Sequence, residues 1–428
     1  MIKFVFCLTL LLMFVSANIT EASLLRIALI EAQATAELNC EDDFFVEDLL
    51  SGKVTVVPAG KYFLRGSGEN IIMDATKIFG KKITIAGAAG KNNPTINKKA
   101  YYGSFRAELL DKELLLINNI VTMESYLKCV LPAKTMSVWP EEVIKAQAVA
   151  ARTYAKYMQE KNRHSMYDLS ANDRELPYAG RASEKDAVTE NINSTAGLYM
   201  TDNAGSPLQA ITTSSSGGKT ESAEDAWGYD VSYLRSVNDY DQDSPDYQWK
   251  RNIKPSVLET ILEQNGYHVG RLTGIRLSPL KFPSGDRTAT GRVKYVFVFG
   301  KYGSAKISGK ELQDFLGLES TLFDVETGVP LPQNLKVSLE NSWGMEVGSK
   351  EIEIRVNEEH VDSGKQLLRE YHFINYSKDG KIIFKGSGKG DGLGLSTWGA
   401  RGLANAFENK FVDILRYYYG EIKLSTEQ

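Results

Sequence analysis

The segment from Val130 to Met158, VLPAKTMSVWPEEVIKAQAVAARTYAKYM, constrains the fold more than any other part of the sequence. Pro140 suits the first turn of a helix, the two glutamates after it favour the positive end of the helix dipole, and an alanine-rich run follows at helical spacing. The segment predicts a long helix from about Pro140 to Gln159. Lys134 is predicted to lie in the loop that leads into this helix, where a lysine needs an explanation.

The segments on either side of this helix predict an α+β fold. Ahead of it, short apolar runs separated by turn residues predict strands in LLRIALIEAQ, KVTVVPAGKYFLR, KITIAGAAG and RAELLDKELLLINNIV. After it, helices are predicted in EKDAVTENINSTAGLYM, ending at Gly197, and in KPSVLETILEQNG. Further strands are predicted around LQAITTSSS, GRVKYVFVFG, SKEIEIRV and REYHFINY, and a glycine-rich loop followed by a helix ends the chain.

The chain of 428 residues, 43% of them hydrophobic, is long enough to bury a full core in two or three lobes. We expect a signal peptide at residues 1–22 and a β-rich amino-terminal lobe at 23–100. The main body is expected at 101–327 and is completed by residues 380–428. Residues 328–379 carry weaker signals and are expected to form an insertion.

Charge and the first residues indicate where the protein acts. The net charge of −4 and the absence of a long basic run give no electrostatic case for nucleic acid. Lys3 precedes an apolar run that ends at Val15 and is followed by small residues, which predicts export and cleavage after Ala17 or Ala22. An uncleaved membrane anchor is the alternative, but the run is shorter than the roughly 20 apolar residues of a bilayer span. A secreted protein with no transmembrane span after cleavage is therefore expected.

Cysteine and histidine spacing predicts no metal site and no cofactor. Cys40 and Cys129 remain in the mature chain, either as a disulfide outside the cytoplasm or as two buried thiols. The four histidines have no metal-ligand spacing with one another or with a cysteine.

Two glycine-rich segments are candidates for a binding site. In TSSSGGKTES, Ser216 and Lys219 match the serine and lysine spacing of penicillin-binding enzymes, but Gly217 and Gly218 oppose the helix that this motif requires. A tight turn with positive φ, or a backbone loop close to a polar ligand, are the other interpretations. GSGKGDGLGLS lacks the Lys-Ser or Lys-Thr pair of a nucleotide loop, so its glycines more readily allow close approach of the main chain.

Seven motifs, taken in order, resemble the SpoIID/LytB family of bacterial cell-wall proteins. They cover nearly the whole chain from about Leu24 to Leu424, and the pairing of KAQAVAARTYA with a downstream SSGG is highly specific. The motifs are TMESYLKCVLP, SVWPEEVIKAQAVAARTYA, LPYAG, TTSSSGGKTES, YLRSV, ISGKELQDFLGLEST and GSGKGDGLGLSTWGARGLA.

The resemblance implies a secreted protein that binds peptidoglycan. SpoIID-like members are lytic transglycosylases that cut glycan strands stripped of their stem peptides, in partnership with an amidase, and LytB-like members are described as amidase enhancers. We therefore expect glycan strands, and a cell-wall amidase, as partners. The residues expected to bind the glycan are Arg152, Tyr178, Ser215, Ser216, Gly217, Gly218 and Ser396.

Lys134 stands where the resemblance implies a catalytic glutamate. The family's loop reads V-V-P-S-E-M-P, and the register held here by Pro132, Trp139 and Pro140 reads V-L-P-A-K-T-M. A lytic transglycosylase needs one group that protonates the glycosidic oxygen and then accepts the proton of the C6 hydroxyl, which a carboxyl with a raised pKa can do. A cation opposes the oxocarbenium-like transition state, and a unit charge about 4 Å away at an effective dielectric near 20 is worth roughly 4 kcal/mol, or about a thousandfold in rate.

Other positions also depart from the family pattern. Lys389, Asp391 and Thr397 replace the Trp, His and Gln of the family's glycine-rich loop. Leu176 replaces a glutamine two residues before Tyr178, and LSANDRELPYAG lacks the Cys and His that bind zinc in some relatives.

Two functional hypotheses follow from these departures. The favoured one is a glycan-binding or amidase-assisting protein whose cleavage activity is lost or weak. The other is an active enzyme with a displaced acid, for which Glu124, in the family's E-x-Y-L motif, and Asp391 are the candidates.

Overall fold

The computed structural model describes residues 24–427 except 75, 89–92, 137, 279, 281–284, 328–333, 341–345, 354–369 and 373–379. The expected signal peptide and most of the expected insertion lie outside the described residues. The chain forms two compact units. Unit 1 comprises the residues up to Ser214, Ser232–Tyr240 and Leu393 onward, and unit 2 comprises Ser215–Val231 and Asp241–Gly392. The mixed α+β fold expected from the sequence is confirmed, whereas the boundaries at 22, 100, 327 and 379 stay predictions.

Unit 1 contains two larger sheets and two short strand pairs. One sheet has the strand order β12-β1-β11-β10-β8-β3-β4, the other has the order β7-β6-β5-β2-β9, and the pairs are β13-β25 and β14-β24. The strands are β1 Leu24–Gln33, β2 Thr35–Cys40, β3 Phe44–Asp48, β4 Val54–Val57, β5 Gly60–Ser67, β6 Asn70–Met73, β7 Lys77–Phe79, β8 Lys82–Gly87, β9 Thr95–Ile96, β10 Ser104–Leu109, β11 Leu115–Thr122, β12 Leu169–Ser170, β13 Leu198–Thr201, β14 Thr212–Thr213, β24 Leu395–Ser396 and β25 Lys423–Thr426.

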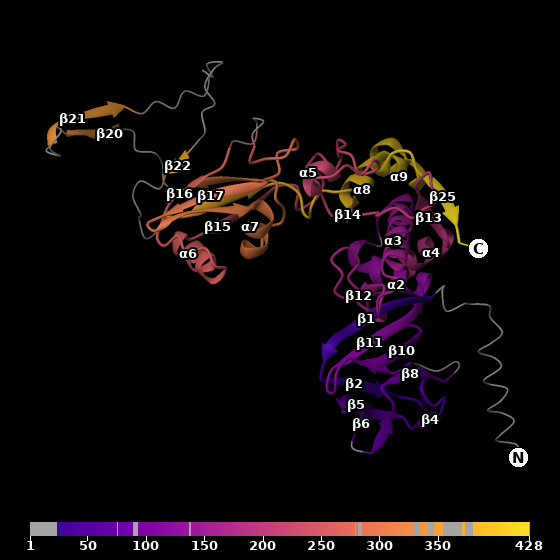
Figure 1. Ribbon diagram of the computed structural model, residues 1–428. Helices are drawn as coiled ribbons and strands as arrows, with labels where there is room; N and C mark the ends of the chain where they lie inside the picture. The colour runs from indigo at the N-terminus through magenta and orange to yellow at the C-terminus, as the bar shows by residue number, and fades with distance from the viewer. Residues whose placement is uncertain are drawn as a thin grey trace, which may run out of the picture. The chain divides into compact units, whose positions relative to one another are not determined.

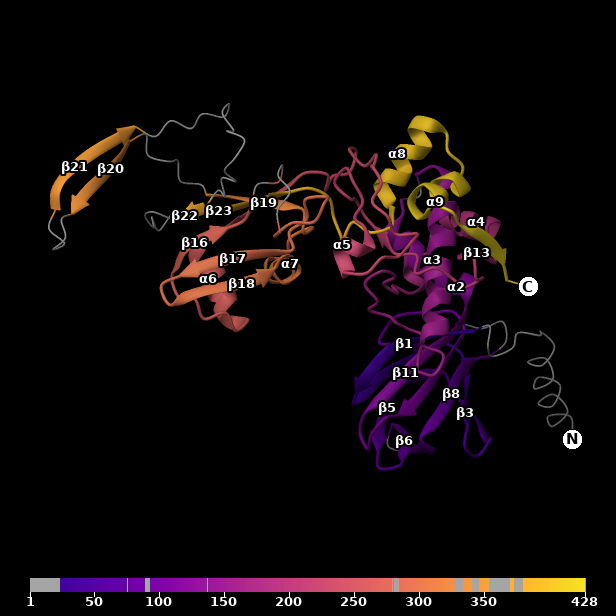
Figure 2. The ribbon, with the colours of Figure 1, turned by 45° about the horizontal axis from the view of Figure 1, so that its top comes forward.

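The helices of unit 1 gather at one end of the large sheets (Figures 1 and 2). They are α2 Met123–Lys134, α3 Glu141–Lys161, the 3₁₀ helix η2 Arg181–Ser183, α4 Asp186–Ser194, α8 Thr397–Phe407 and α9 Phe411–Tyr419. The predicted long helix is confirmed as α3, which begins one residue after Pro140. In contrast, the prediction of a loop at Lys134 is wrong, because this residue ends α2. Pro132 lies inside α2 and removes one backbone donor, which obscured the helical pattern.

A buried ion pair joins the helices of unit 1. The fully buried guanidinium of Arg152, on α3, contacts the Glu124 carboxylate, on α2, at 2.8 Å. The same guanidinium donates to the carbonyl oxygens of Leu198, at 2.9 Å, and Ile192, at 3.4 Å. Glu124 also accepts from the backbone N–H of Gly197, at 3.1 Å. One arginine therefore ties α2, α3, the end of α4 and β13 together.

Unit 2 is built from two sheets with short helices. The sheet orders are β15-β23-β19 and β18-β17-β16-β22, and β20 and β21 form a separate hairpin. Apolar residues of α6 and α7, including Leu258 and Leu312, share one core with Val296 and Val298 of β17. The elements are α5 Ala223–Trp227, β15 Trp249–Ile253, α6 Pro255–Gln264, β16 Leu272–Arg276, β17 Tyr295–Gly300, β18 Gly303–Ser308, α7 Gly309–Leu316, β19 Phe323–Thr327, β20 Asn334–Glu340, β21 Glu346–Glu353, β22 Glu370–His372 and β23 Ile382–Gly386.

Two further features concern the cysteines and the search for membrane-spanning helices. Cys40 and Cys129 are buried thiols rather than the two halves of a disulfide. Within the described residues, no helix is long and apolar enough to cross a membrane.

Replacing Glu124 tests the buried ion pair. Glu124→Ala leaves the Arg152 charge buried without its carboxylate, and we expect the free energy of unfolding to fall by about 3 kcal/mol. Chemical denaturation measures the loss. The matched control is Glu141→Ala, because the Glu141 side chain is 74% exposed in its pair with Lys145. This control should change stability by less than about 1 kcal/mol, and equal losses in the two variants would contradict the role given to Arg152.

Candidate functional site

The site begins at the carboxyl end of α2, where Lys134 is half-buried. Its ammonium donates to the backbone carbonyl oxygen of Glu175 and, at 3.0 Å, to the hydroxyl of Thr212. These contacts connect residues that are 41 and 78 positions away in the sequence. Lys134 is thus fixed in a polar cluster and does not extend freely into solvent.

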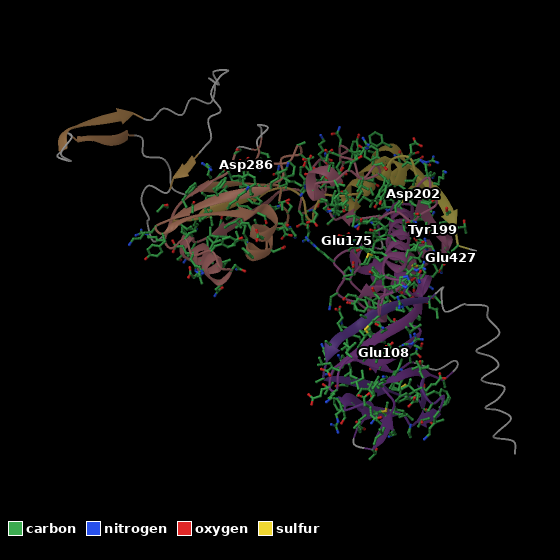
Figure 3. All side chains as sticks on the ribbon, viewed as in Figure 1. Glu108, Glu175, Tyr199, Asp202, Asp286 and Glu427 are labelled. Atoms are coloured by element: carbon green, nitrogen blue, oxygen red, sulfur yellow. The ribbon has the colours of Figure 1, made fainter. Side chains whose placement is uncertain are left out.

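The segment around Glu175 supplies the carboxylates of this cluster, and Figure 3 labels Glu175 itself. The Glu175 carboxylate accepts from the backbone N–H of Thr212 at 3.2 Å and from its hydroxyl at 3.5 Å. Asp173 accepts the backbone N–H groups of Glu175 and Leu176, both at 2.9 Å. Its other oxygen accepts from the Tyr154 hydroxyl at 3.3 Å. We call Lys134, Asp173, Glu175 and Thr212 the lysine–carboxylate cluster.

Burial and charge act on Lys134 in opposite directions. Desolvation lowers the pKa of its ammonium, while the carboxylates of Glu175 and Asp173 oppose the shift, and the net direction is downward. The cluster therefore holds a lysine that loses its proton more easily than an exposed lysine does.

Short strands connect the lysine–carboxylate cluster to the start of α8. Thr212 pairs with Leu395 in the parallel ladder of β14 and β24, where the left-handed Gly394 backbone lets the chains approach closely. The Thr397 hydroxyl donates to the Thr213 carbonyl at 3.1 Å. The next residue, half-buried Trp398, packs edge-on against Trp139 with a ring separation of 5.2 Å. An aromatic pair thus joins the start of α8 to the segment before α3.

Four of the residues predicted for the site have structural contacts in unit 1. Glu124 and Arg152 form the buried ion pair described above. Tyr178 is buried against Tyr126, donates to Asn119 at 2.7 Å, and has a pKa raised by burial. Ser396 is buried and caps α8 by accepting from the Gly399 N–H at 3.1 Å. Their predicted roles in catalysis or glycan binding stay predictions.

Unit 2 contains the predicted binding loop of Ser215, Ser216, Gly217 and Gly218. The loop folds onto the buried Asp241 carboxylate, which accepts from the Ser215 hydroxyl and from the N–H groups of Gly217 and Gly218 at 2.8 and 2.9 Å. Both glycines have left-handed backbones, with φ of 81° and 102°, so the tight turn expected from the sequence is present. Both serines are buried, and the Ser215 hydroxyl has a protein partner.

The last predicted site residue, Asp391, also lies in unit 2, where its carboxylate is 3.9 Å from the Lys310 ammonium. Lys389, in the same glycine-rich loop, contacts Glu319 at 3.0 Å and Asp246 at 3.5 Å. Among the described residues of both units, no group of three or more His, Cys, Asp or Glu side chains is arranged to hold a metal ion.

Sequence reasoning missed the residues that contact the predicted positions. Glu175 directly precedes the LPYAG motif. Asp241 is one of many acidic residues in the segment from Trp227 to Trp249, which is also rich in aromatic residues. No local signal distinguishes either one, because the partner of Glu175 lies 37 positions away and the partners of Asp241 lie at least 23 positions away. Only charge pairing could have given a hint, because a lysine in an unexplained position predicts a carboxylate near it.

Removing Asp241 tests its hold on the loop. Asp241→Ala removes a buried charged acceptor from three donors, each worth roughly 1.5 to 3 kcal/mol, so we expect a clear fall in the melting temperature. Differential scanning fluorimetry measures it. Glu263→Ala is the control, because its pair with His268 is exposed and should be worth less than about 1 kcal/mol. A melting temperature unchanged by Asp241→Ala would contradict this account of the loop.

Comparison with known proteins places part of unit 1 in a family. Residues 111–201 match the SpoIID model, described as stage II sporulation protein. This range includes α2, α3 and the Glu175 segment.

Three relatives resemble longer stretches of the chain. An uncharacterized protein of Brachyspira hyodysenteriae is 24% identical over 77% of this chain and 73% of its own length. The amidase enhancer of Bacillus subtilis is 24% identical over 90% of this chain, but the match spans only 52% of the enhancer. The stage II sporulation protein D of Bacillus subtilis is 25% identical over 48% of this chain and 60% of its own length.

Proposed function

Because the chain belongs to the SpoIID family, we propose that it binds peptide-free glycan strands of peptidoglycan outside the cytoplasmic membrane and assists a cell-wall amidase. The relatives support a role connected with the cell wall. The name of one relative, amidase enhancer, supports the choice of partner. The apolar run at the amino terminus supports export.

The state of Lys134 is the observation that carries the binding function. At the position where the resemblance implies a general acid, this chain has an ammonium held by the Glu175 carbonyl and the Thr212 hydroxyl. A cation fixed there disfavours positive charge on the sugar ring in the transition state, while it leaves hydrogen bonding to a bound strand intact. Strand binding with weak cleavage is therefore the function that this geometry supports best.

Binding and assistance can be measured separately. The purified protein should sediment with peptidoglycan whose stem peptides have been removed, and it should increase the rate at which a cell-wall amidase releases peptides from intact peptidoglycan. No sedimentation with peptide-free strands would contradict the binding function. Binding without any effect on the amidase would contradict only the assisting role.

Restoring a carboxyl at position 134 tests whether this position faces the glycosidic oxygen. In Lys134→Glu, burial and the neighbouring Asp173 and Glu175 carboxylates should raise the pKa of the new carboxyl and keep its proton available. We expect the release of anhydro-muramyl ends from peptide-free strands to rise about a hundredfold or more, since general acid catalysis contributes 10² to 10⁴.

Lys134→Ala is the matched control for this experiment. It removes the cation without supplying a proton, so it should gain little activity. If Lys134→Glu binds strands as the wild type does but releases no more anhydro-muramyl ends, position 134 does not face the scissile bond.

A further inference from the structure

We propose that one face of the sheet β18-β17-β16-β22 in unit 2 is a second glycan-binding surface, which holds peptide-free strands by the free lactyl carboxylates of their muramic acid sugars. We call this surface the aromatic–cation face, and it consists of Arg276, Tyr295, Phe297, Phe299 and Lys306. The inference rests on the proposed binding of glycan strands and adds a contact outside residues 111–201, the part of the chain that the SpoIID model matches. The whole surface belongs to unit 2.

Alternation along β17 forms the aromatic part of this face. Val296 and Val298 belong to the core that α6 and α7 help to form. Successive residues of a strand point to opposite sides of a sheet, so Tyr295, Phe297 and Phe299 form a row on the side away from this core. All three residues are half-buried, and the rings of Tyr295 and Phe297 meet edge to face with their centres 5.5 Å apart. The sheet therefore presents a row of partly exposed rings.

Two cations cover the two ends of this row. The strand register pairs Phe297 with Arg276 of β16 on one side and with Lys306 of β18 on the other, so both cations belong to the same face. The Arg276 guanidinium lies 4.4 Å from the centre of the Phe297 ring and 5.6 Å from that of the Phe299 ring. The Lys306 ammonium lies 3.8 Å from the centre of the Tyr295 ring. Aromatic rings attract cations to their faces, which keeps both charges in place.

Both cations keep donors for a ligand. Within the part of the chain that the structure describes, neither Arg276 nor Lys306 has a hydrogen-bond acceptor or an ion pair, and their contacts are with the rings. Arg276 is half-buried and Lys306 is exposed. A guanidinium that lies over a ring still has N–H groups at its edges, where two of them match the two oxygens of a carboxylate. This face is therefore suited to a ligand that carries carboxylates.

The charge of this face is opposite to that of the whole chain. The chain has a net charge of −4. In the register of the face, Arg276 and Lys306 are accompanied by one acidic residue, Glu370 of β22, which pairs with Arg276. The charges in this register therefore amount to +1, which favours an anionic ligand.

A peptide-free strand is a ligand of this kind. An amidase that removes a stem peptide hydrolyses the amide between the lactyl group of muramic acid and the peptide, and this leaves a free lactyl carboxylate on the sugar. Such a strand has one carboxylate on every second sugar, and the apolar C–H faces of the sugar rings lie between them. Arg276 and Lys306 fit the carboxylates, and the exposed parts of the three rings fit the C–H faces. The aromatic–cation face therefore favours strands on which an amidase has already acted.

The experiment measures sedimentation of the full chain with peptide-free strands and with chitin, whose N-acetylglucosamine sugars have no lactyl carboxylate. The double variant Arg276→Gln with Lys306→Gln should bind peptide-free strands about tenfold more weakly than wild type. Any binding to chitin should be the same in both proteins. The control is Lys250→Gln, because Lys250 is an exposed lysine on β15, in the other sheet of unit 2. This control should bind peptide-free strands as wild type does.

Carbodiimide coupling of wild type gives a second measurement, which does not require the variant to fold. The reagent joins a carboxylate to an amine in contact with it, so a peptide-free oligosaccharide should become linked to Lys306 and not to Lys250, as mass spectrometry of the digested protein would show. Equal binding by wild type and the double variant, an equal loss of chitin binding, or no coupling at Lys306 would overturn this inference and leave the proposed function standing. Wild type that does not bind peptide-free strands would overturn both.

Discussion

The arrangement of unit 1 depends on the buried pair of Arg152 and Glu124. An arginine with no exposed side-chain surface is costly to bury, and the Glu124 carboxylate together with two carbonyl oxygens compensates for this cost. The pair fixes the start of α2 against α3, and the rigidity of the helix carries that position to Lys134 at its other end. Arg152, which the sequence resemblance predicts to bind the glycan, therefore has a structural role in the protein.

The neighbours of Lys134 change how this residue is interpreted. The sequence alone predicts a lysine in a loop, at the position where the resemblance implies a catalytic acid. In the structure it ends a helix and binds Glu175 and Thr212, so the substitution comes with a carboxylate beside it. Glycan binding requires only that a strand fits over this cluster, whereas the ammonium at position 134 disfavours cleavage there.

Local patterns predicted the parts of the fold that local physics determines. The spacing of the alanine-rich run fixed α3 to within a residue or two, and alternating apolar residues located β1, β8 and β17. The same reasoning failed at α2, where Pro132 interrupts the helical pattern although packing of Tyr126 and Leu127 stabilises the helix. It also failed for the site, since the contacts from Lys134 to Glu175 and Thr212, and from Asp241 to its loop, join distant segments. Tertiary pairing of this kind leaves no periodic trace in the sequence.

The most direct measurement is a crystal structure of the protein with a peptide-free tetrasaccharide of alternating N-acetylglucosamine and N-acetylmuramic acid. The account predicts that the strand lies over the lysine–carboxylate cluster, with the Lys134 ammonium within about 3 Å of the glycosidic oxygen between two sugars. A strand bound only away from this cluster would contradict it.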